Sequence, residues 1–201
     1  MDRKIIALFC GSFNPPLFSH FSLAEQLLNS DNNIEKIIFV PVSNKFNKDG
    51  LISDEHRFNM LNLVCEKNPR FEVSDIEFNS PRQPYTFETM QAMQKLYPEH
   101  EIRLIIGTDN LKKIDTWYEI EQLLSNFKVF VLARDEDNVE DIINNHNLLC
   151  KYSSSFVKSN VSIRTNLSSS FVRNEIKNKN SVRYLLPDEV IEYIKNNNLY
   201  M

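Results

Sequence analysis

The segment from Cys10 to His20 reads Cys-Gly-Ser-Phe-Asn-Pro-Pro-Leu-Phe-Ser-His and combines a glycine with a histidine. Gly11 has no side chain, so a phosphate group could approach the backbone closely there. A helix predicted to begin at His20 would present N–H groups and its positive dipole end to the same anion. The segment contains neither a P-loop ending nor a GxGxxG pattern. It predicts a phosphate site, although a lone histidine at a helix start is more often a cap or a surface residue.

A second candidate anion site lies near the end of the chain, where Ser168, Ser169 and Ser170 precede Arg173. The β-like residues Val161 to Arg164 come before it. Hydroxyls at a helix start, backbone N–H groups and a guanidinium are all good partners for phosphate. A serine run is equally good N-cap chemistry, and the sequence does not decide between the two interpretations. Two anion sites on one sheet would suit a triphosphate held at both ends.

Two further segments carry groups suited to a nucleotide. Asp109 follows Gly107 at a predicted strand end, where a carboxylate can hold a ribose hydroxyl. Tyr85 and Thr86 stand at a predicted helix start, with Thr86 as the predicted N-cap. Trp117 is the only tryptophan; a lone tryptophan is more often a core residue, but here its flat ring could face an aromatic ligand.

The composition narrows the classes of function. The net charge of −4 and the absence of a long basic run argue against a nucleic-acid partner. Three widely spaced cysteines, Cys10, Cys65 and Cys150, form no zinc pattern and indicate reduced thiols. No stretch approaches the roughly 18 apolar residues of a membrane span. We therefore expect a cytoplasmic protein with no resident metal site and no membrane partner.

Alternating short apolar runs and amphipathic segments predict a Rossmann-like, doubly wound α/β fold with a parallel sheet in a single domain, residues 1–201. The predicted strands are Ile5–Phe9, Lys36–Pro41, Arg103–Ile106 and Lys128–Ala133. The predicted helices are His20–Leu28, Asp54–Cys65, Thr86–Leu96 and Tyr118–Leu124, followed by a C-terminal helical segment at about 168–201. The chain has only three glycines in 201 residues, whereas glycine makes up about 7% of the residues of an average protein. Gly11 and Gly107 both follow predicted strands, where open α/β sheets bind ligands.

These segments, in this order, resemble the nicotinate and nicotinamide mononucleotide adenylyltransferases of the nucleotidyltransferase superfamily. The resemblance covers nearly the whole chain. Four motifs lie in the first part of the chain: a Gly-x-Phe-Asn-Pro-Pro loop ending in His20, a lysine loop with His56-Arg57, a Tyr-Thr-x-x-Thr helix start at Tyr85, and Gly-Thr-Asp-Asn-Leu from Gly107 with the later Trp117. Three follow: Arg134 after a strand, the Ser168–Arg173 segment, and the ending from Ser181 to Tyr200. Each motif is weak alone, but seven in the right order are a strong signal.

The resemblance implies AMP transfer from ATP to nicotinate mononucleotide, with Mg²⁺ carried by ATP and with a homo-oligomer as a possibility. His20, Lys48 and Arg173 are the expected catalytic residues. The expected ATP-binding residues are Gly11, Ser12, Phe13, His20, Gly107, Asp109, Arg134, Ser168, Ser169, Ser170 and Arg173. The expected mononucleotide-binding residues are Asn14, Lys45, Lys48, Tyr85, Thr86 and Trp117. The sequence leaves open which of the two lysines reaches phosphate.

One departure from the family pattern lies in the first loop, where Leu17 stands in place of the first histidine. In the family that histidine contacts ATP phosphate, so Ser19 or a lysine of the 45–48 loop would have to compensate, and Leu17→His would then raise the rate only if neither did. Two alternatives therefore stay open. One is a related pantetheine-phosphate adenylyltransferase or cytidylyltransferase, and the other is a nucleotide-binding sensor without turnover.

Overall fold

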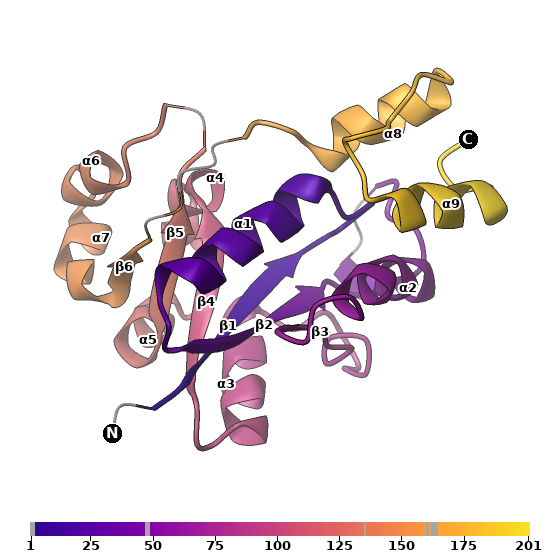
Figure 1. Ribbon diagram of the computed structural model, residues 1–201. Helices are drawn as coiled ribbons and strands as arrows, with labels where there is room; N and C mark the ends of the chain where they lie inside the picture. Colours follow the sequence, from indigo (N-terminus) through magenta and orange to yellow (C-terminus); the bar gives the residue numbers. More distant parts are fainter. Residues whose placement is uncertain (1–2, 47–48, 135, 160, 162–164) are drawn as a thin grey trace.

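Six parallel strands form the centre of the molecule, in the order β3-β2-β1-β4-β5-β6 (Figure 1). The computed structural model describes residues 3–46, 49–134, 136–159, 161 and 165–201. The strands are Ile5–Gly11 (β1), Ile34–Pro41 (β2), Phe71–Val73 (β3), Glu101–Gly107 (β4), Lys128–Leu132 (β5) and Phe156–Lys158 (β6). This strand order is that of a doubly wound nucleotide-binding sheet, which confirms the predicted fold class.

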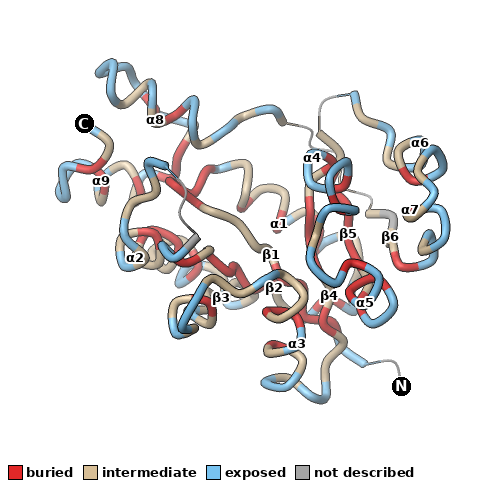
Figure 2. Tube along the Cα trace, turned by 180° about the vertical axis from the view of Figure 1, so that it is seen from behind, coloured by how far each residue is buried: buried red, intermediate tan, exposed pale blue. Residues whose placement is uncertain are grey.

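The central strands are apolar because both faces of the sheet are covered. Ile6 and Leu8 of β1 pack into the cluster on one face, whereas Ile5 and Ala7 pack into the cluster on the other. Residues alternate between faces along a strand, so a continuous apolar run is what a strand buried on both sides requires. Figure 2 shows the consequence, a buried sheet surrounded by helices whose outer sides are exposed.

Helices cover both faces of the sheet. The helix α1 (Phe18–Ser30) and the helix α2 (Asp54–Cys65) pack on one face, and α3 (Thr86–Leu96) and α5 (Ile120–Asn126) pack on the other. The shorter helices are α4 (Thr108–Leu111), α6 (Val139–Asn144) and α7 (Asn147–Lys151), and the 3₁₀ turns are η1 (Asn44–Phe46), η2 (Ile114–Thr116) and η3 (Ser153–Ser155). In α1 the buried residues Phe21, Ala24, Leu27 and Leu28 follow helical spacing.

The C-terminal segment forms its own small core. Its helices are α8 (Ser169–Lys177) and α9 (Asp188–Asn196); α9 packs against α2, and α8 lies near the start of α1 (Figure 1). Val172, Leu186, Val190 and other apolar residues of this segment pack against Met60 of α2. The segment is therefore anchored to the helices that follow the first two strands.

The predicted elements differ from the observed ones mainly at their ends. The strands β3 and β6, three residues each, were not predicted, because such short runs carry too little pattern. Helix α1 begins at Phe18, two residues before His20. Val161 lies outside any strand, and residues 162–164 of the predicted β-like run lie outside the described residues.

Candidate active site

The two glycines singled out by the sequence lie at the ends of neighbouring strands. Gly11 is the last residue of β1 and Gly107 is the last residue of β4, and these two strands pair directly. The strand order runs outward in opposite directions from this pair, which makes their carboxyl ends the position where an open α/β sheet binds its ligand. The other candidate residues can be placed relative to this point.

Neighbouring side chains explain why both positions are glycine. A Cβ atom at Gly11 would lie 3.2 Å from the ring of Phe13, a buried residue whose φ of 45° is left-handed. A Cβ atom at Gly107 would lie 2.4 Å from Oδ1 of Asp109 and 3.1 Å from Nε of Arg134. The first glycine therefore makes room for a folded-back phenylalanine, in addition to the expected phosphate. The second makes room for the Asp109–Arg134 ion pair, whose atoms lie 3.2 Å apart.

His20 is held in one tautomer in the first turn of α1. The backbone N–H of Leu17 donates to its Nδ1 over 2.9 Å, so Nε2 carries the proton of the neutral ring. The ring packs edge-on against Phe9 and Phe13, with centroids 5.9 and 5.0 Å apart. Burial lowers the pKa of His20 to about 3, and the positive charge of Arg134 contributes. His20 is therefore a neutral hydrogen-bond donor at physiological pH.

The start of α1 offers fewer free N–H groups than the sequence predicted. The N–H of Leu17 is taken by His20, and the N–H of Phe18 donates to the carbonyl of Leu185 over 3.1 Å. The Leu17 side chain is 1% exposed and packs in the apolar cluster of the C-terminal segment. The position that holds a histidine in the resembled family thus faces the core in this chain.

The second anion segment docks directly on the first. Ser169 Oγ donates to the carbonyl of Pro15 over 2.9 Å, and Nη1 of Arg173 donates to the carbonyl of Asn14 over 2.9 Å. The Ser168 hydroxyl caps α8 by accepting from the Phe171 N–H. The two segments predicted as anion sites therefore lie in direct contact rather than at two separate ends, and the serine hydroxyls have partners within the chain.

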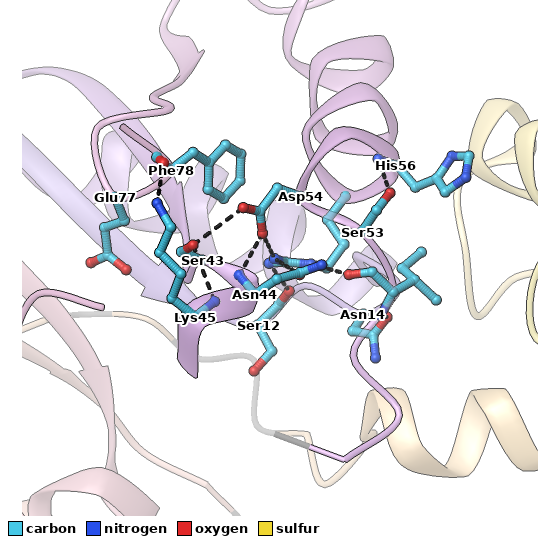
Figure 3. A network of polar contacts seen from close by, with 12 residues as sticks. Ser12, Asn14, Ser43, Asn44, Lys45, Ser53, Asp54, His56, Glu77 and Phe78 are labelled. Atoms are coloured by element: carbon cyan, nitrogen blue, oxygen red, sulfur yellow. Dashed lines mark hydrogen bonds and ion pairs between the residues drawn. The ribbon is translucent and has the colours of Figure 1, made fainter. Parts of the chain in front are cut away.

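A buried arginine, Arg57, holds the backbone of the loop after β1. In the sequence it stands out only as part of the His56-Arg57 motif. Arg57 is fully buried and donates from Nη1 to the Ser12 carbonyl over 3.1 Å. Its Nη2 forms an ion pair with Asp54 over 2.6 Å. Asp54 in turn accepts from the Ser43 hydroxyl and the Asn44 N–H, and Figure 3 shows these residues gathered around Asp54. Arg57 is buried and Asp54 is partly exposed, so removing Asp54 would leave a buried guanidinium without its charge partner.

The predicted mononucleotide residues fall into different surroundings. Lys45 donates through Nζ to the carbonyls of Phe78 and Ser80, which ties it to the following loop (Figure 3). Lys48 lies outside the described residues. The Asn14 side chain is buried and has partners on both its nitrogen and its oxygen. Asn14 therefore braces the loop, and its contact with a mononucleotide stays a prediction.

The structure brings the Tyr85 segment and the Trp117 segment together. The rings of Tyr85 and Tyr118 stack with centroids 4.4 Å apart, and about half of each side chain is exposed. Trp117 is half-buried and packs against the core below α3. Sequence reasoning missed Tyr118, although its position next to the singled-out tryptophan was a signal. The stacked rings of Tyr85 and Tyr118 form an aromatic surface that a flat ligand can contact.

The N-cap of α3 is Tyr85, and not Thr86 as the sequence predicted. The Tyr85 N–H donates to Glu88 Oε2 over 2.8 Å, so this N–H is already used. Arg82 neutralises Glu88 through two hydrogen bonds of 2.6 and 3.0 Å. The negative charge at this helix start is therefore balanced within the chain. Thr86 lies in the first turn, where the helix dipole favours an anion.

Neither a metal-ligand cluster nor a membrane-spanning helix is present among the described residues. No group of three or more His, Cys, Asp and Glu side chains in these ranges is placed to hold a metal ion. No helix in the part of the chain that the structure describes has the length and apolar character that a membrane span requires.

Comparison with known proteins places this geometry in a family. The model of the cytidylyltransferase-like family matches residues 8–175. A protein of Carboxydothermus hydrogenoformans described as "Probable nicotinate-nucleotide adenylyltransferase" is 36% identical over 97% of both chains. A Flavobacterium psychrophilum protein with the same description is 33% identical over 97% of this chain and 98% of its own. The chain belongs to the nicotinate-nucleotide adenylyltransferases of the cytidylyltransferase-like family.

Solved structures agree on the fold of this family member. Plasmodium falciparum nicotinic acid mononucleotide adenylyltransferase complexed with NaAD has a TM-score of 0.82, with 22% identity over 98% of this chain and 97% of the other. The same enzyme complexed with APC has a TM-score of 0.80 over the same shares of the two chains. In this family member the fold places a neutral donor, a guanidinium and an aromatic surface along one edge of the sheet.

Proposed function

We propose that the protein transfers AMP from ATP to nicotinate mononucleotide, giving nicotinate adenine dinucleotide and pyrophosphate, the adenylation step of NAD biosynthesis. The observation that carries the proposal is the docking of the Ser169–Arg173 segment onto the Gly11–His20 loop at the carboxyl ends of β1 and β4. Relatives that match the whole chain carry this activity in their descriptions.

The reaction needs no covalent protein nucleophile. An oxygen of the mononucleotide 5′-phosphate attacks the α-phosphorus of ATP in line, and the bond from that phosphorus to the bridging oxygen of the β-phosphate breaks. Pyrophosphate leaves with the electron pair. The attacking group is already anionic at neutral pH, so the protein has to align the two phosphates and stabilise negative charge.

Each charged or polar group then has a distinct role. His20 donates from Nε2 to a phosphate oxygen without changing the charge of the site, because its ring is neutral. Arg173 supplies positive charge beside the loop. Asp109 at the end of β4 accepts from ribose hydroxyls of ATP, and Arg134 orients it. Lys48 remains a proposed phosphate contact on the strength of the family resemblance alone.

Mg²⁺ enters this scheme as part of the substrate. The carboxylates of the described part of the candidate site, Asp54, Glu88 and Asp109, are each paired with an arginine. Mg²⁺ prefers to keep several waters and to bind substrate phosphates. We therefore propose that the ion is held by ATP and water, and that this chain's residues contact the phosphates.

The proposed acceptor is the acid, nicotinate mononucleotide, rather than the amide. The half-exposed, stacked rings of Tyr85 and Tyr118 offer a ring face to a cationic pyridine, and Trp117 is the residue before Tyr118 in the chain. The first turn of α3 offers a positive dipole end to the carboxylate, since Arg82 neutralises Glu88. A charge-assisted hydrogen bond is roughly twice as strong as a neutral one, which favours the acid. Each difference of about 1.4 kcal/mol would give a tenfold preference.

The test is pyrophosphate release from ATP and Mg²⁺ with nicotinate mononucleotide, nicotinamide mononucleotide or pantetheine phosphate as acceptor. We expect turnover with the first and a kcat/KM at least about tenfold lower with the second. Turnover with pantetheine phosphate alone would assign the protein to that neighbouring activity. If the protein binds ATP but releases no pyrophosphate from it with any of the three acceptors, it is a nucleotide sensor.

The role of Trp117 is tested by Trp117→Ala and Trp117→Phe in the same assay. If the ring contacts the pyridine, the alanine variant raises the KM for nicotinate mononucleotide while the KM for ATP changes little, and phenylalanine restores part of the loss. Trp117 also packs against the core, so urea unfolding of both variants separates stability from binding. An unchanged KM in the alanine variant would return Trp117 to a purely structural role.

A further inference from the structure

Three backbone carbonyls in the loop after β1 are held by donors from distant parts of the chain. The oxygens of Ser12, Asn14 and Pro15 accept from Arg57, Arg173 and Ser169, respectively, over 3.1, 2.9 and 2.9 Å. A carbonyl oxygen that pointed toward a phosphate would repel it. These donors therefore satisfy three carbonyl oxygens of the loop, and the Ser12 carbonyl points toward the buried Arg57.

The contact of Arg57 with the Ser12 carbonyl also orients a backbone N–H of the loop. In a trans peptide the C=O and N–H bonds point in opposite directions, so holding the Ser12 carbonyl toward Arg57 aims the Phe13 N–H away from Arg57. Pro15 and Pro16 have no N–H to offer. The loop thus depends on fixed backbone orientation, and any residue that fixes it from behind contributes to phosphate binding.

A fourth holding contact comes from the end of the chain. The Tyr200 hydroxyl donates to Oδ1 of Asn14 over 2.8 Å, across 186 positions of sequence. The Asn14 amide then donates to the Gly50 carbonyl over 2.7 Å, while the Ile52 N–H approaches Oδ1 at 3.5 Å. The Asn14 side chain is 3% exposed. A buried amide oxygen that loses its good donor has no water to replace it.

The backbone after α9 places the Tyr200 hydroxyl next to Asn14. Leu199 packs in the apolar cluster with Leu17, and its N–H donates to the Ile194 carbonyl after α9 ends. Tyr200 then adopts a left-handed φ of 63°, a costly conformation for a residue with a side chain. Burial raises the pKa of Tyr200 above its ordinary value, so the hydroxyl keeps its proton and donates at working pH.

We propose that Tyr200 is a positioning residue for the phosphate loop, acting through Asn14 on the reaction proposed above. Its hydroxyl fixes the Asn14 side chain, which joins the loop after β1 to residues 50–52. Arg173 holds the backbone of the same residue. The last residues of the chain are thereby part of the ATP-binding apparatus without touching the substrate.

The test compares two tyrosine hydroxyls of the C-terminal segment. Tyr200→Phe removes the contact to Asn14. The matched control Tyr193→Phe removes a hydroxyl on α9 that contacts Asn59 over 3.1 Å and His56 over 3.0 Å, both on α2. For each variant we would measure kcat, the KM for ATP and for the mononucleotide, the Kd of a non-hydrolysable ATP analogue, and the urea midpoint.

We expect Tyr200→Phe to lower kcat/KM for ATP about tenfold and to weaken the ATP analogue by a similar factor, which corresponds to about 1.4 kcal/mol. The KM for the mononucleotide should change less than twofold. Tyr193→Phe should leave all kinetic constants within about twofold of wild type, even if its urea midpoint falls as far as that of Tyr200→Phe. Equal kinetic effects in the two variants would overturn the proposal.

A double mutant checks the route of the effect. If Tyr200 acts through Asn14, the variant Asn14→Ala/Tyr200→Phe should be no worse than Asn14→Ala alone. Additive losses would show that Tyr200 acts elsewhere and would overturn the assignment. A wild-type protein without turnover would refute the proposed function. The affinity of the ATP analogue for Tyr200→Phe and Tyr193→Phe would still decide the role of Tyr200.

Discussion

A histidine in a phosphate site is usually regarded as a positive charge, but His20 is built to be neutral. Its Nδ1 accepts the Leu17 N–H, and its ring packs edge-on against Phe9 and Phe13. Protonation at Nδ1 would break the first contact and place a charge among aromatic rings near Arg134. What His20 offers is one N–H in a fixed direction, the type of donor that stabilises developing charge without reorganisation.

We predict that His20→Ala lowers kcat by about 10²–10³-fold, the usual cost of losing one preorganised donor. His20→Asn is the companion variant, because it retains a side-chain amide but not the Nε2 position. Steady-state kinetics with saturating ATP would measure both, with circular dichroism to verify the fold. Activity within about threefold of wild type in His20→Ala would refute the phosphate assignment.

The burial of Leu17 changes the expected effect of Leu17→His on the catalytic rate. The side chain is buried beside Met60 and Val172, so an imidazole there would lose solvation among apolar groups. We predict that Leu17→His destabilises the protein by about 2–3 kcal/mol and does not raise kcat. Leu17→Met keeps the volume and should cost less than about 1.5 kcal/mol. Urea unfolding measures both, and a faster, equally stable Leu17→His enzyme would contradict this prediction.

At the scale of elements, the decisive feature is the docking of α8 on the loop that precedes α1. Ser168 caps α8, Ser169 holds Pro15 and Arg173 holds Asn14. A run of three serines therefore serves both as N-cap chemistry and as the docking surface of the loop. The N-cap interpretation is confirmed for Ser168, and the anion site stays a prediction.

Arg173 makes two contacts in different directions, one to Asn14 and one to the Ser170 hydroxyl. A planar guanidinium can maintain both while it faces phosphate, and an ammonium cannot. We predict that Arg173→Lys lowers kcat/KM for ATP at least about tenfold. Arg183→Lys, at an exposed position in the same segment, is the control and should keep wild-type kinetics. Equal rates for Arg173→Lys and wild type would refute the assignment.

At the scale of the whole molecule, His20 also couples stability to pH. Its pKa is about 3 in the folded protein and about 6.5 in an unfolded chain. Between these values the unfolded state binds the extra proton, so stability is fully present above about pH 6.5 and falls as the pH drops toward 3.

We predict a loss of up to about 1.4 kcal/mol per pH unit from this group in that window. Urea unfolding at pH 7.0, 6.0 and 5.0 would measure it. In His20→Asn, which cannot titrate there, the slope should be smaller by the contribution of one proton. Identical slopes for the two proteins would show that His20 is not held neutral by the fold.

Local patterns were sufficient for the four central strands of the sheet and for the family. The apolar runs after Lys4 and before Gly107 predict strands buried on both faces, because burial leaves no alternation of polar residues. The order of the motifs around Gly11, Tyr85, Gly107 and Ser168 carries the family resemblance. The short strand Phe71–Val73 was missed because three residues do not make a pattern, and pairing with β2 is what makes them a strand.

The sequence by itself determined the fold class and the family and predicted the segments of the candidate site, because these follow from periodicity, turn residues and motif order. Only the tertiary structure decided what individual side chains do. Leu17 and Asn14 face inward, and Arg57 and Tyr200 hold the phosphate loop from behind. The physical reason is that these roles depend on contacts between residues up to 186 positions apart. Burial and hydrogen-bond partners at such separations arise from packing, which no local pattern contains.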